Sequence, residues 1–294
     1  MFSKLEQIKL KIKNVLNKEN IFKFLFLLCA LISIFAVITI CLFLFSNAIP
    51  TIVKIGFKNF IFGTEWFPLD LELFGIFPMI IGTFYVTALS LMIGIPIGIL
   101  SAIYLSQLSP SLFKRILTLT VELLGAIPSV VYGFFGLLII VPFISDILNV
   151  SGKNLLSASL VLSIMILPTM ILISKSALES VPKHYDEAAI ALGITPERSL
   201  FFIKIKAAKS GILTSIILSI SRAIGEAMAV IMVAGNQVQI PNSVLDGFRT
   251  LSTNIVLEMG YAQDLHRDAL IANAAVLFVL ILIINLSFKC LKSR

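Results

Sequence analysis

Residues 21–45 read IFKFLFLLCALISIFAVITICLFLF, a run in which Lys23 is the only charged residue. A helix needs about 20 apolar residues to cross the hydrocarbon core of a bilayer, whereas the apolar region of a signal peptide spans about 7–15. The run therefore predicts a retained transmembrane helix. Cleavage at Ser46-Asn47-Ala48 is the alternative interpretation.

The rest of the chain repeats this pattern. Hydrophobic residues make up 58% of the sequence and charged residues 13%. In soluble domains, about half of the residues are apolar and about a quarter are charged. Alternating segments of about ten residues, typical of membrane β-barrels, are absent. We therefore expect an all-α membrane protein with six transmembrane helices. Its predicted spans are approximately 21–45, 77–105, 117–144, 155–178, 211–235 and 268–288.

The positive residues predict the orientation of this bundle. The net charge of +7 does not indicate a nucleic-acid partner, because the basic residues flank the apolar runs. An even number of spans places both termini on one side, and 17 of the 23 Lys and Arg residues fall there. The opposite side collects Lys54, Lys58, Lys153, Arg249 and Arg267. Because basic residues favour the cytoplasmic side, both termini are predicted to be cytoplasmic, and residues 1–20 form a cytoplasmic segment before a membrane domain over 21–290.

Cofactor chemistry is not indicated. Cys29 and Cys41 lie inside the first run and Cys290 follows the last, so a disulfide framework is not expected. His184 and His266 are far apart in sequence, and no residues have metal-ligand spacing. We expect no cofactor and no metal.

Proline and glycine interrupt several spans. Pro96, Pro128 and Pro168 lie at or near mid-span, and each removes a helical hydrogen bond. Glycines accompany them in residues 94–98 and 133–136. Small residues allow close packing of helices, and kinked helices can also surround a path that opens. Both interpretations remain open.

The long segment over 46–76 is predicted to lie outside the cytoplasm. It carries the sole tryptophan, Trp66, together with Phe67, Pro68 and Phe74. These aromatic residues are typical of anchors at the membrane interface, or they form part of a docking surface.

The loop over 180–210 is far more polar than its flanks. Asp186 and Glu187 favour the start of a helix, the alanines that follow are strong helix formers, and Gly193 is a stop signal. Thr195 and Pro196 then have the pattern of a cap and first residue of a second helix. The local chemistry alone is consistent with an ordinary solvent loop or with a docking helix.

Three ionisable residues lie within predicted spans: Glu122, Arg222 and Glu226. Glu122 is near a helix end, where it can reach water or pair with Arg115, so we expect a structural role. Arg222 and Glu226 are spaced one helical turn apart, and Ser219 and Ser215 continue that face. This stripe is either an internal ion pair or a path lining in which Arg222 meets an anionic substrate.

The polar loop resembles the EAA motif of bacterial ABC importer permeases. The matching residues are Glu187-Ala188-Ala189, then Gly193 after three residues and Ile203 after nine more. The resemblance implies that this loop is a coupling helix that inserts into an ATP-binding subunit. The family's usual Ile-x-Leu-Pro ending is replaced here by Ile203-Lys204-Ile205-Lys206, which puts the sharp turn into the fifth span in doubt.

Further stretches are similar to the PstC-type permeases of phosphate ABC importers. They are residues 62–66, 74–78, 96–105 and 122–133, and the run from Arg222 to Val230, which includes Met228-Ala229-Val230. The resemblance covers roughly residues 55–290. One departure is Ala227, where a threonine is common in that family.

The resemblance implies a type I ABC importer bundle in a bacterial inner membrane. Its implied partners are membrane lipid, a PstA-type second permease, two PstB-type ATP-binding subunits and an external PstS-type phosphate-binding protein. The chain has no Gly-x4-Gly-Lys-Ser/Thr loop, so it is expected not to hydrolyse ATP itself. A permease for molybdate or sulfate is the nearest alternative. An ATP-independent secondary transporter is a more distant one, since the internal repeat common in such proteins is not found.

Overall fold

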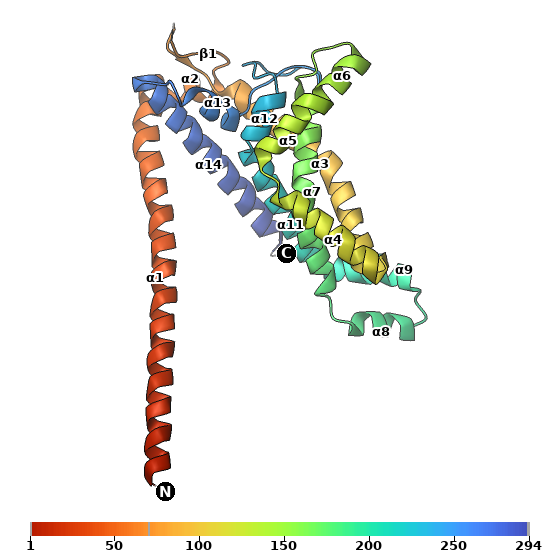
Figure 1. Cartoon of the computed structure of the whole chain (residues 1–294). Helices are drawn as coiled ribbons and strands as arrows, with labels where there is room; N and C mark the ends of the chain where they lie inside the picture. The colour runs from red at the N-terminus through yellow and green to blue at the C-terminus, as the bar shows by residue number, and fades with distance from the viewer. Residues whose placement is uncertain (1, 70, 293–294) are drawn as a thin grey trace.

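The chain folds almost entirely into helices, as the computed structural model in Figure 1 shows. The structure describes the backbone of residues 2–69 and 71–292 and the side chains of 19–69, 71–288 and 290. The α-helices are α1 (Phe2–Ile55), α2 (Phe57–Phe62), α3 (Phe77–Ile103), α4 (Ser111–Ala126), α5 (Ser129–Phe135), α6 (Val141–Leu148), α7 (Leu155–Glu179), α8 (His184–Ala191), α9 (Pro196–Ser199), α10 (Ile205–Ala207), α11 (Lys209–Gly225), α12 (Met228–Val233), α13 (Leu251–Glu258) and α14 (Asp264–Lys292). Three π-helical segments, η1 (Tyr104–Leu108), η2 (Gly136–Ile140) and η3 (Leu200–Lys204), and the strands β1 (Trp66–Phe67) and β2 (Leu73–Phe74) complete the fold.

Five helical stretches in the described residues are long and apolar enough to cross a membrane. They are Glu19–Ile55, Phe77–Leu108, Ser129–Leu148, Leu155–Glu179 and Asp264–Phe288. The prediction of an all-α membrane protein is confirmed. The predicted spans over 21–45, 77–105, 155–178 and 268–288 each form one continuous helical stretch.

The other two predicted spans are each interrupted, so the described residues do not form the six continuous transmembrane helices that were predicted. The run over 117–144 is interrupted at Ile127–Pro128 between α4 and α5, and the run over 211–235 at Glu226–Ala227 between α11 and α12. Pro128 lacks an N–H and disfavours helical backbone at Ile127, which is extended at ψ 129°. The Tyr132 hydroxyl donates a hydrogen bond to the Leu124 carbonyl at 2.7 Å across this break.

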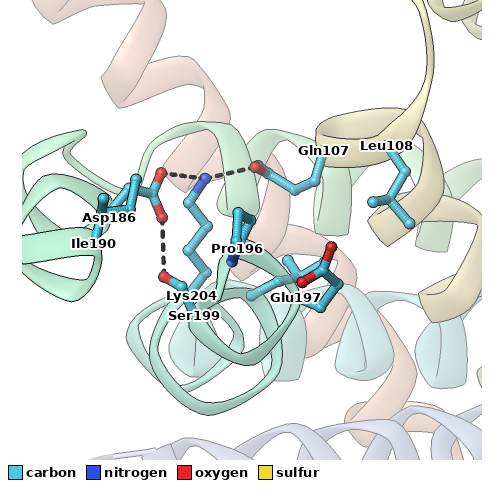
Figure 2. Close-up of a pocket in the computed structure, with 9 residues that line it drawn as sticks. Gln107, Leu108, Asp186, Ile190, Pro196, Glu197, Ser199 and Lys204 are labelled. Atoms are coloured by element: carbon cyan, nitrogen blue, oxygen red, sulfur yellow. Dashed lines mark hydrogen bonds and ion pairs between the residues drawn. The ribbon is translucent and has the colours of Figure 1, made fainter. Parts of the chain in front are cut away.

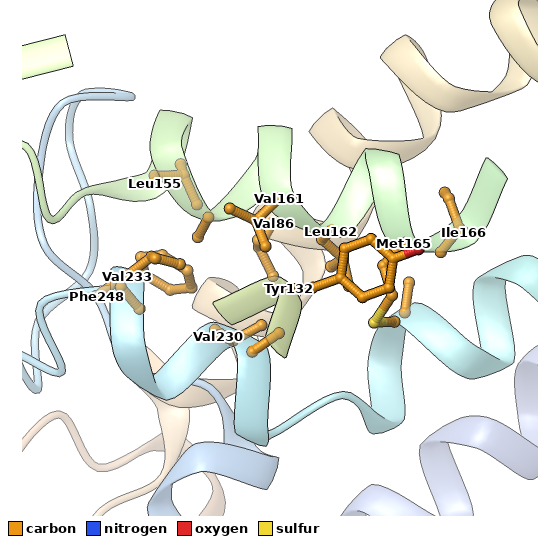
Figure 3. Packing of buried hydrophobic residues seen from close by; sticks show 14 residues of the cluster. Val86, Tyr132, Leu155, Val161, Leu162, Met165, Ile166, Val230, Val233 and Phe248 are labelled. Atoms are coloured by element: carbon orange, nitrogen blue, oxygen red, sulfur yellow. The ribbon is translucent and has the colours of Figure 1, made fainter. Parts of the chain in front are cut away.

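The centre of the bundle is the packing of α3 against α7. An added Cβ at Gly94 would lie 2.9 Å from Ile166 Cδ1, and one at Gly98 would lie 2.7 Å from Met170 Sδ. The glycines thus permit close helix approach, as one of the two interpretations predicted, and α3 and α7 continue through Pro96 and Pro168. Figure 3 shows the adjoining apolar core, which joins α3, α5, α7 and α12.

Helix α1 stands apart from this core along most of its length (Figure 1). Its 54 residues would extend about 80 Å at 1.5 Å per residue, well beyond the thickness of a bilayer. It packs against α14, but the side chains of its most apolar stretch are not buried by any other part of the described chain. Its start lies toward the same end of the molecule as α8, opposite the β1–β2 hairpin. Side chains 2–18, 289 and 291–294, which carry much of the basic charge behind the predicted orientation, lie outside the described residues.

The hairpin end of the molecule encloses Trp66. This residue is 4% exposed and packs edge-on against Phe74, with ring centroids 5.6 Å apart. Neither an interfacial anchor nor an open docking surface therefore describes Trp66, because the protein itself covers the indole. Phe67, its neighbour, is the exposed aromatic residue of β1.

Candidate functional site

The polar loop forms the predicted helix, break and second helix. Helix α8 ends in a Schellman motif, because the Gly193 N–H donates to the Ile190 carbonyl at 2.9 Å and the Ile194 N–H to the Ala189 carbonyl at 3.0 Å. Gly193 has φ +75°, a left-handed conformation that suits glycine. The Thr195 side chain caps α9 by accepting from the Arg198 N–H, and Pro196 occupies its first turn.

Helix α8 presents most of its surface outward. Glu187, Ala188 and Gly193 are exposed, together with Ile190 and Leu192, which are 60% and 80% exposed. Ala189 differs, since it is 1% exposed and packs against the chain itself. Of the four predicted coupling residues, Glu187, Ala188 and Gly193 are therefore accessible to a partner. Ala189 is not, because it packs against the rest of the chain.

The connection from α8 into the membrane bends despite the missing proline. The chain runs through α9, η3 and α10, and a turn at Ala208 then starts α11. Ala208 is buried in a small core with Ile103, Leu178, Leu200 and Ile212. The chain therefore bends at a buried alanine, two residues after Lys206, the position at which the resembling family has its proline.

Arg222 lies on α11 three residues before its end. Its Nη1 donates a hydrogen bond to Thr169 Oγ1 at 2.9 Å, beside Pro168 of α7. This is the one hydrogen bond recorded for Arg222 in the described part of the chain, although a guanidinium has five N–H donors. Thr169 gave no signal in the sequence, because a single threonine in an apolar run is common.

Glu226 does not pair with Arg222. Helix α11 ends at Gly225, and Glu226 is extended at φ −73° and ψ 119°, so the one-turn spacing no longer applies. No ion pair joins the two residues within the described chain, and the internal ion-pair interpretation was wrong for this structure. The Glu226 Oε1 atom instead accepts from the Ala229 N–H at 3.0 Å, at the start of α12. Gly225 followed by an acidic residue was the sequence signal for this break.

The two serines of the predicted stripe are buried. Ser215 Oγ lies 2.7 Å from Ser174 Oγ of α7, which joins α11 to the central bundle. Ser219 Oγ has no hydrogen-bond partner among the residues that the structure describes. Glu122 is exposed on α4, and no ion pair with Arg115 is found in the described residues.

A buried carboxylate at the hairpin end was missed by sequence reasoning. Glu258, at 6% exposure, receives Arg249 Nη1 at 2.6 Å and Trp66 Nε1 at 2.8 Å. His266 Nε2 lies 2.9 Å from Oε2, the oxygen that also accepts from Trp66 Nε1, whereas Arg249 binds Oε1. Trp66 is 192 positions from Glu258, and Arg249 and His266, nine and eight positions away, lie outside α13, so no helical spacing indicated the cluster. Arg249 supplies the counter-charge for this carboxylate, because burying a charged group without a partner would cost several kcal/mol of folding free energy.

The sequence matches a known family model. Residues 94–294 match the model described as "Binding-protein-dependent transport system inner membrane component". The chain is 38% identical over 272 residues to the probable ABC transporter permease protein YqgH of Bacillus subtilis, covering 90% of this chain and 88% of that protein. It is 33% identical over 262 residues to the phosphate transport system permease protein PstC of Mesorhizobium japonicum, covering 82% and 80%.

Solved structures share the fold. A chain of a bacterial ABC transporter involved in import of the acidic polysaccharide alginate superposes with a TM-score of 0.62 at 16% identity, covering 91% of this chain and 95% of that chain. A chain of the inward-facing MetNI methionine ABC transporter gives a TM-score of 0.55 at 18% identity, covering 74% and 93%. The predicted type I importer bundle is therefore confirmed as the fold.

Proposed function

Because the chain belongs to the family of binding-protein-dependent transport system inner membrane components, we propose that it is the PstC-type permease subunit of an ATP-driven phosphate importer. Permeases of this family are multi-pass inner-membrane components, and ATP is hydrolysed by separate subunits. The finer step, phosphate as the substrate, is supported by the PstC proteins among the relatives.

The observation that carries the proposal is the position of Arg222 on α11, close to the break between α11 and α12. A half-buried guanidinium with one hydrogen-bond acceptor in the described chain, Thr169 Oγ1, has N–H donors left for an oxyanion. Its planar fork suits two oxygens of phosphate, which can form two parallel hydrogen bonds. Glu226 is engaged with the start of α12, and no carboxylate of the described residues forms an ion pair with Arg222. Phosphate would pass Arg222, and Ser219 and Ser215, which are buried in this structure, would line the path only after α11 and α7 separate.

The coupling step is assigned to α8. Glu187, Ala188 and Gly193 would contact a PstB-type ATP-binding subunit, and closure of two such subunits would displace the helix. The exposed apolar side chains of Ile190 and Leu192 support this docking role, because a protein surface in water rarely leaves such residues clustered without a partner. A PstA-type permease would complete the path, and a PstS-type protein would deliver phosphate from outside. The assignment of both termini and α8 to the cytoplasm belongs to the same proposal.

The test is uptake of radiolabelled phosphate in a strain that lacks the native permease. Arg222→Ala is expected to lower uptake by about ten- to a hundredfold, since hydrogen bonds to charged groups contribute about 1.5–3 kcal/mol. Arg267→Ala removes an exposed arginine at the hairpin end and is expected to leave uptake unchanged. Each variant is purified with its partner subunits to establish that the complex assembles.

Three results would count against the proposal. Unaltered uptake by Arg222→Ala would remove the path role of the guanidinium while family membership stands. Absence of radiolabelled phosphate uptake by the wild-type complex, together with uptake of labelled molybdate or sulfate, would identify another oxyanion as the substrate. Uptake without any associated ATPase would favour a secondary transporter.

A further inference from the structure

Lys204 lies at the centre of a polar network beside α8. Its Nζ is 2.5 Å from Asp186 Oδ2 and donates to Gln107 Oε1, also at 2.5 Å. The other Asp186 oxygen accepts from Ser199 Oγ at 3.2 Å. Figure 2 shows the ammonium between the two acceptors. Only 14% of the Lys204 side chain is exposed, so this ion pair is better shielded from water than a typical surface pair.

The network joins three parts of the chain. Asp186 belongs to α8, Gln107 to η1 at the end of α3, and Lys204 to η3, which leads into α11. The backbone connects α8 directly only to its neighbours in sequence, α7 and α9. The contact with Gln107 therefore adds a link from α8 to α3 that the chain path does not provide.

Few apolar contacts hold α8 to the bundle. Ala189 is its one buried residue, and no α8 residue belongs to the apolar core clusters of the described chain. The Asp186–Lys204–Gln107 network is thus a main attachment of α8 to the membrane helices. Loss of such a contact would let α8 move without carrying α3 with it.

The link lies where the helices have room to shift. Gln107 and Lys204 each lie in a π-helical segment, a rare geometry that is frequent at functional sites. A cavity of about 200 Å³ adjoins the network, lined among others by Leu108, Ile190 and Leu200. A polar link beside a cavity can keep two helices together during a displacement that a tightly packed core would resist.

We propose that Lys204 is a positioning residue that transmits displacement of α8 to α3 as well as to α11. The proposal rests on the coupling role of α8 given above. Lys204 stands in the EAA-like segment between Ile203 and Ile205, where the family pattern leaves the residue type open. In this chain, the Lys204 ammonium binds both Asp186 and Gln107, so a displacement of α8 by the ATP-binding partner would move α3 and α11 together.

The test uses the complete complex in liposomes, with ATP hydrolysis and phosphate uptake measured in the same sample. Lys204→Gln and Asp186→Asn are each expected to raise the ATP consumed per phosphate about tenfold, a typical magnitude for coupling between sites. The double variant is expected to be no worse than either single one, because both remove the same interaction. Lys206→Gln removes an exposed lysine whose ammonium lies 5.9 Å from the centre of the Phe202 ring, and it is expected to keep the wild-type ratio.

A charge exchange separates the link from general damage. Asp186→Lys combined with Lys204→Glu restores the ion pair, and the Gln107 amide can rotate to donate to the new carboxylate. This variant is expected to recover most of the wild-type ratio. An unchanged ratio in Lys204→Gln, or no recovery on charge exchange, would overturn the proposal.

A second readout does not depend on the substrate. Spin labels at Leu192 and Leu108, both exposed, report the distance between α8 and the end of α3 after the three native cysteines are replaced. Lys204→Gln is expected to broaden this distance distribution, whereas an unchanged distribution would overturn the link. Absence of phosphate uptake in the wild-type complex would instead count against the proposed substrate, with the distance measurement still deciding on Lys204.

Discussion

At the residue scale, Glu226 shows how one carboxylate changes role when a helix ends. A continuous helix would place it one turn from Arg222, but α11 ends at Gly225. The carboxylate then accepts from the Ala229 N–H, and Ser252 Oγ donates to the Glu226 carbonyl at 3.0 Å. Glu226 therefore acts as a helix cap at the start of α12, and it forms no ion pair with Arg222 in the described chain.

Two substitutions of Glu226 distinguish a cap from an ion pair. Glu226→Gln keeps an oxygen that can accept from Ala229, so phosphate uptake is expected to stay within about twofold of wild type. Glu226→Ala removes the cap at a cost of about 1 kcal/mol and is expected to lower uptake further. Uptake assays on assembled complexes measure the difference. Equal, severe loss in both variants would show that the negative charge itself is required.

At the element scale, α8 combines a defined end with an open surface. The Schellman motif fixes where the helix stops, and a Cβ at Gly193 would meet no atom within 4 Å. A side chain at this position would therefore disturb the isolated chain only through its left-handed backbone, which costs about 1–2 kcal/mol. Any larger effect on transport would report contact with a partner.

Gly193→Asp is expected to separate ATP hydrolysis from uptake, because the added carboxylate would enter the interface with the ATP-binding subunit. ATPase activity and phosphate uptake in vesicles measure this effect. Gly260→Asp is the control, because its Cβ position is also open but lies at the hairpin end of the molecule. Normal uptake by the Gly193→Asp complex would contradict the docking role of α8.

At the scale of the whole molecule, Glu258 ties the long first outer segment to the end of the fold. Its carboxylate joins Trp66 of β1, Arg249 before α13 and His266 of α14. The surrounding apolar cluster includes Phe60, Phe74, Leu251 and Leu270. Polar and apolar contacts together hold the hairpin against α13 and α14, opposite the end that carries α8.

Glu258→Gln is expected to destabilise the purified complex by about 3 kcal/mol, because it leaves Arg249 without its buried counter-charge. The melting temperature in detergent measures the loss. Glu65→Gln, an exposed glutamate in the same outer segment, is expected to leave the melting temperature unchanged. The same melting temperature for Glu258→Gln and wild type would show that the cluster contributes little to stability.

The sequence by itself determined the membrane class, most of the span positions and the helix ends in the polar loop. Apolar runs of membrane length, Gly193 as a stop and Thr195-Pro196 as a start act through local backbone and solvation preferences, so they can be read from neighbouring residues. The EAA-like spacing also predicts, without any geometry, that α8 is the coupling helix.

Only the tertiary structure decided which side chains meet. The break at Glu226–Ala227 turned an expected ion pair into a cap, and Thr169 became the partner of Arg222 from another helix. The Lys204 network and the Glu258 cluster join residues 97 and 192 positions apart in their longest contacts. Such contacts depend on how helices pack, and the period of a single helix carries no information about the partner that it will face.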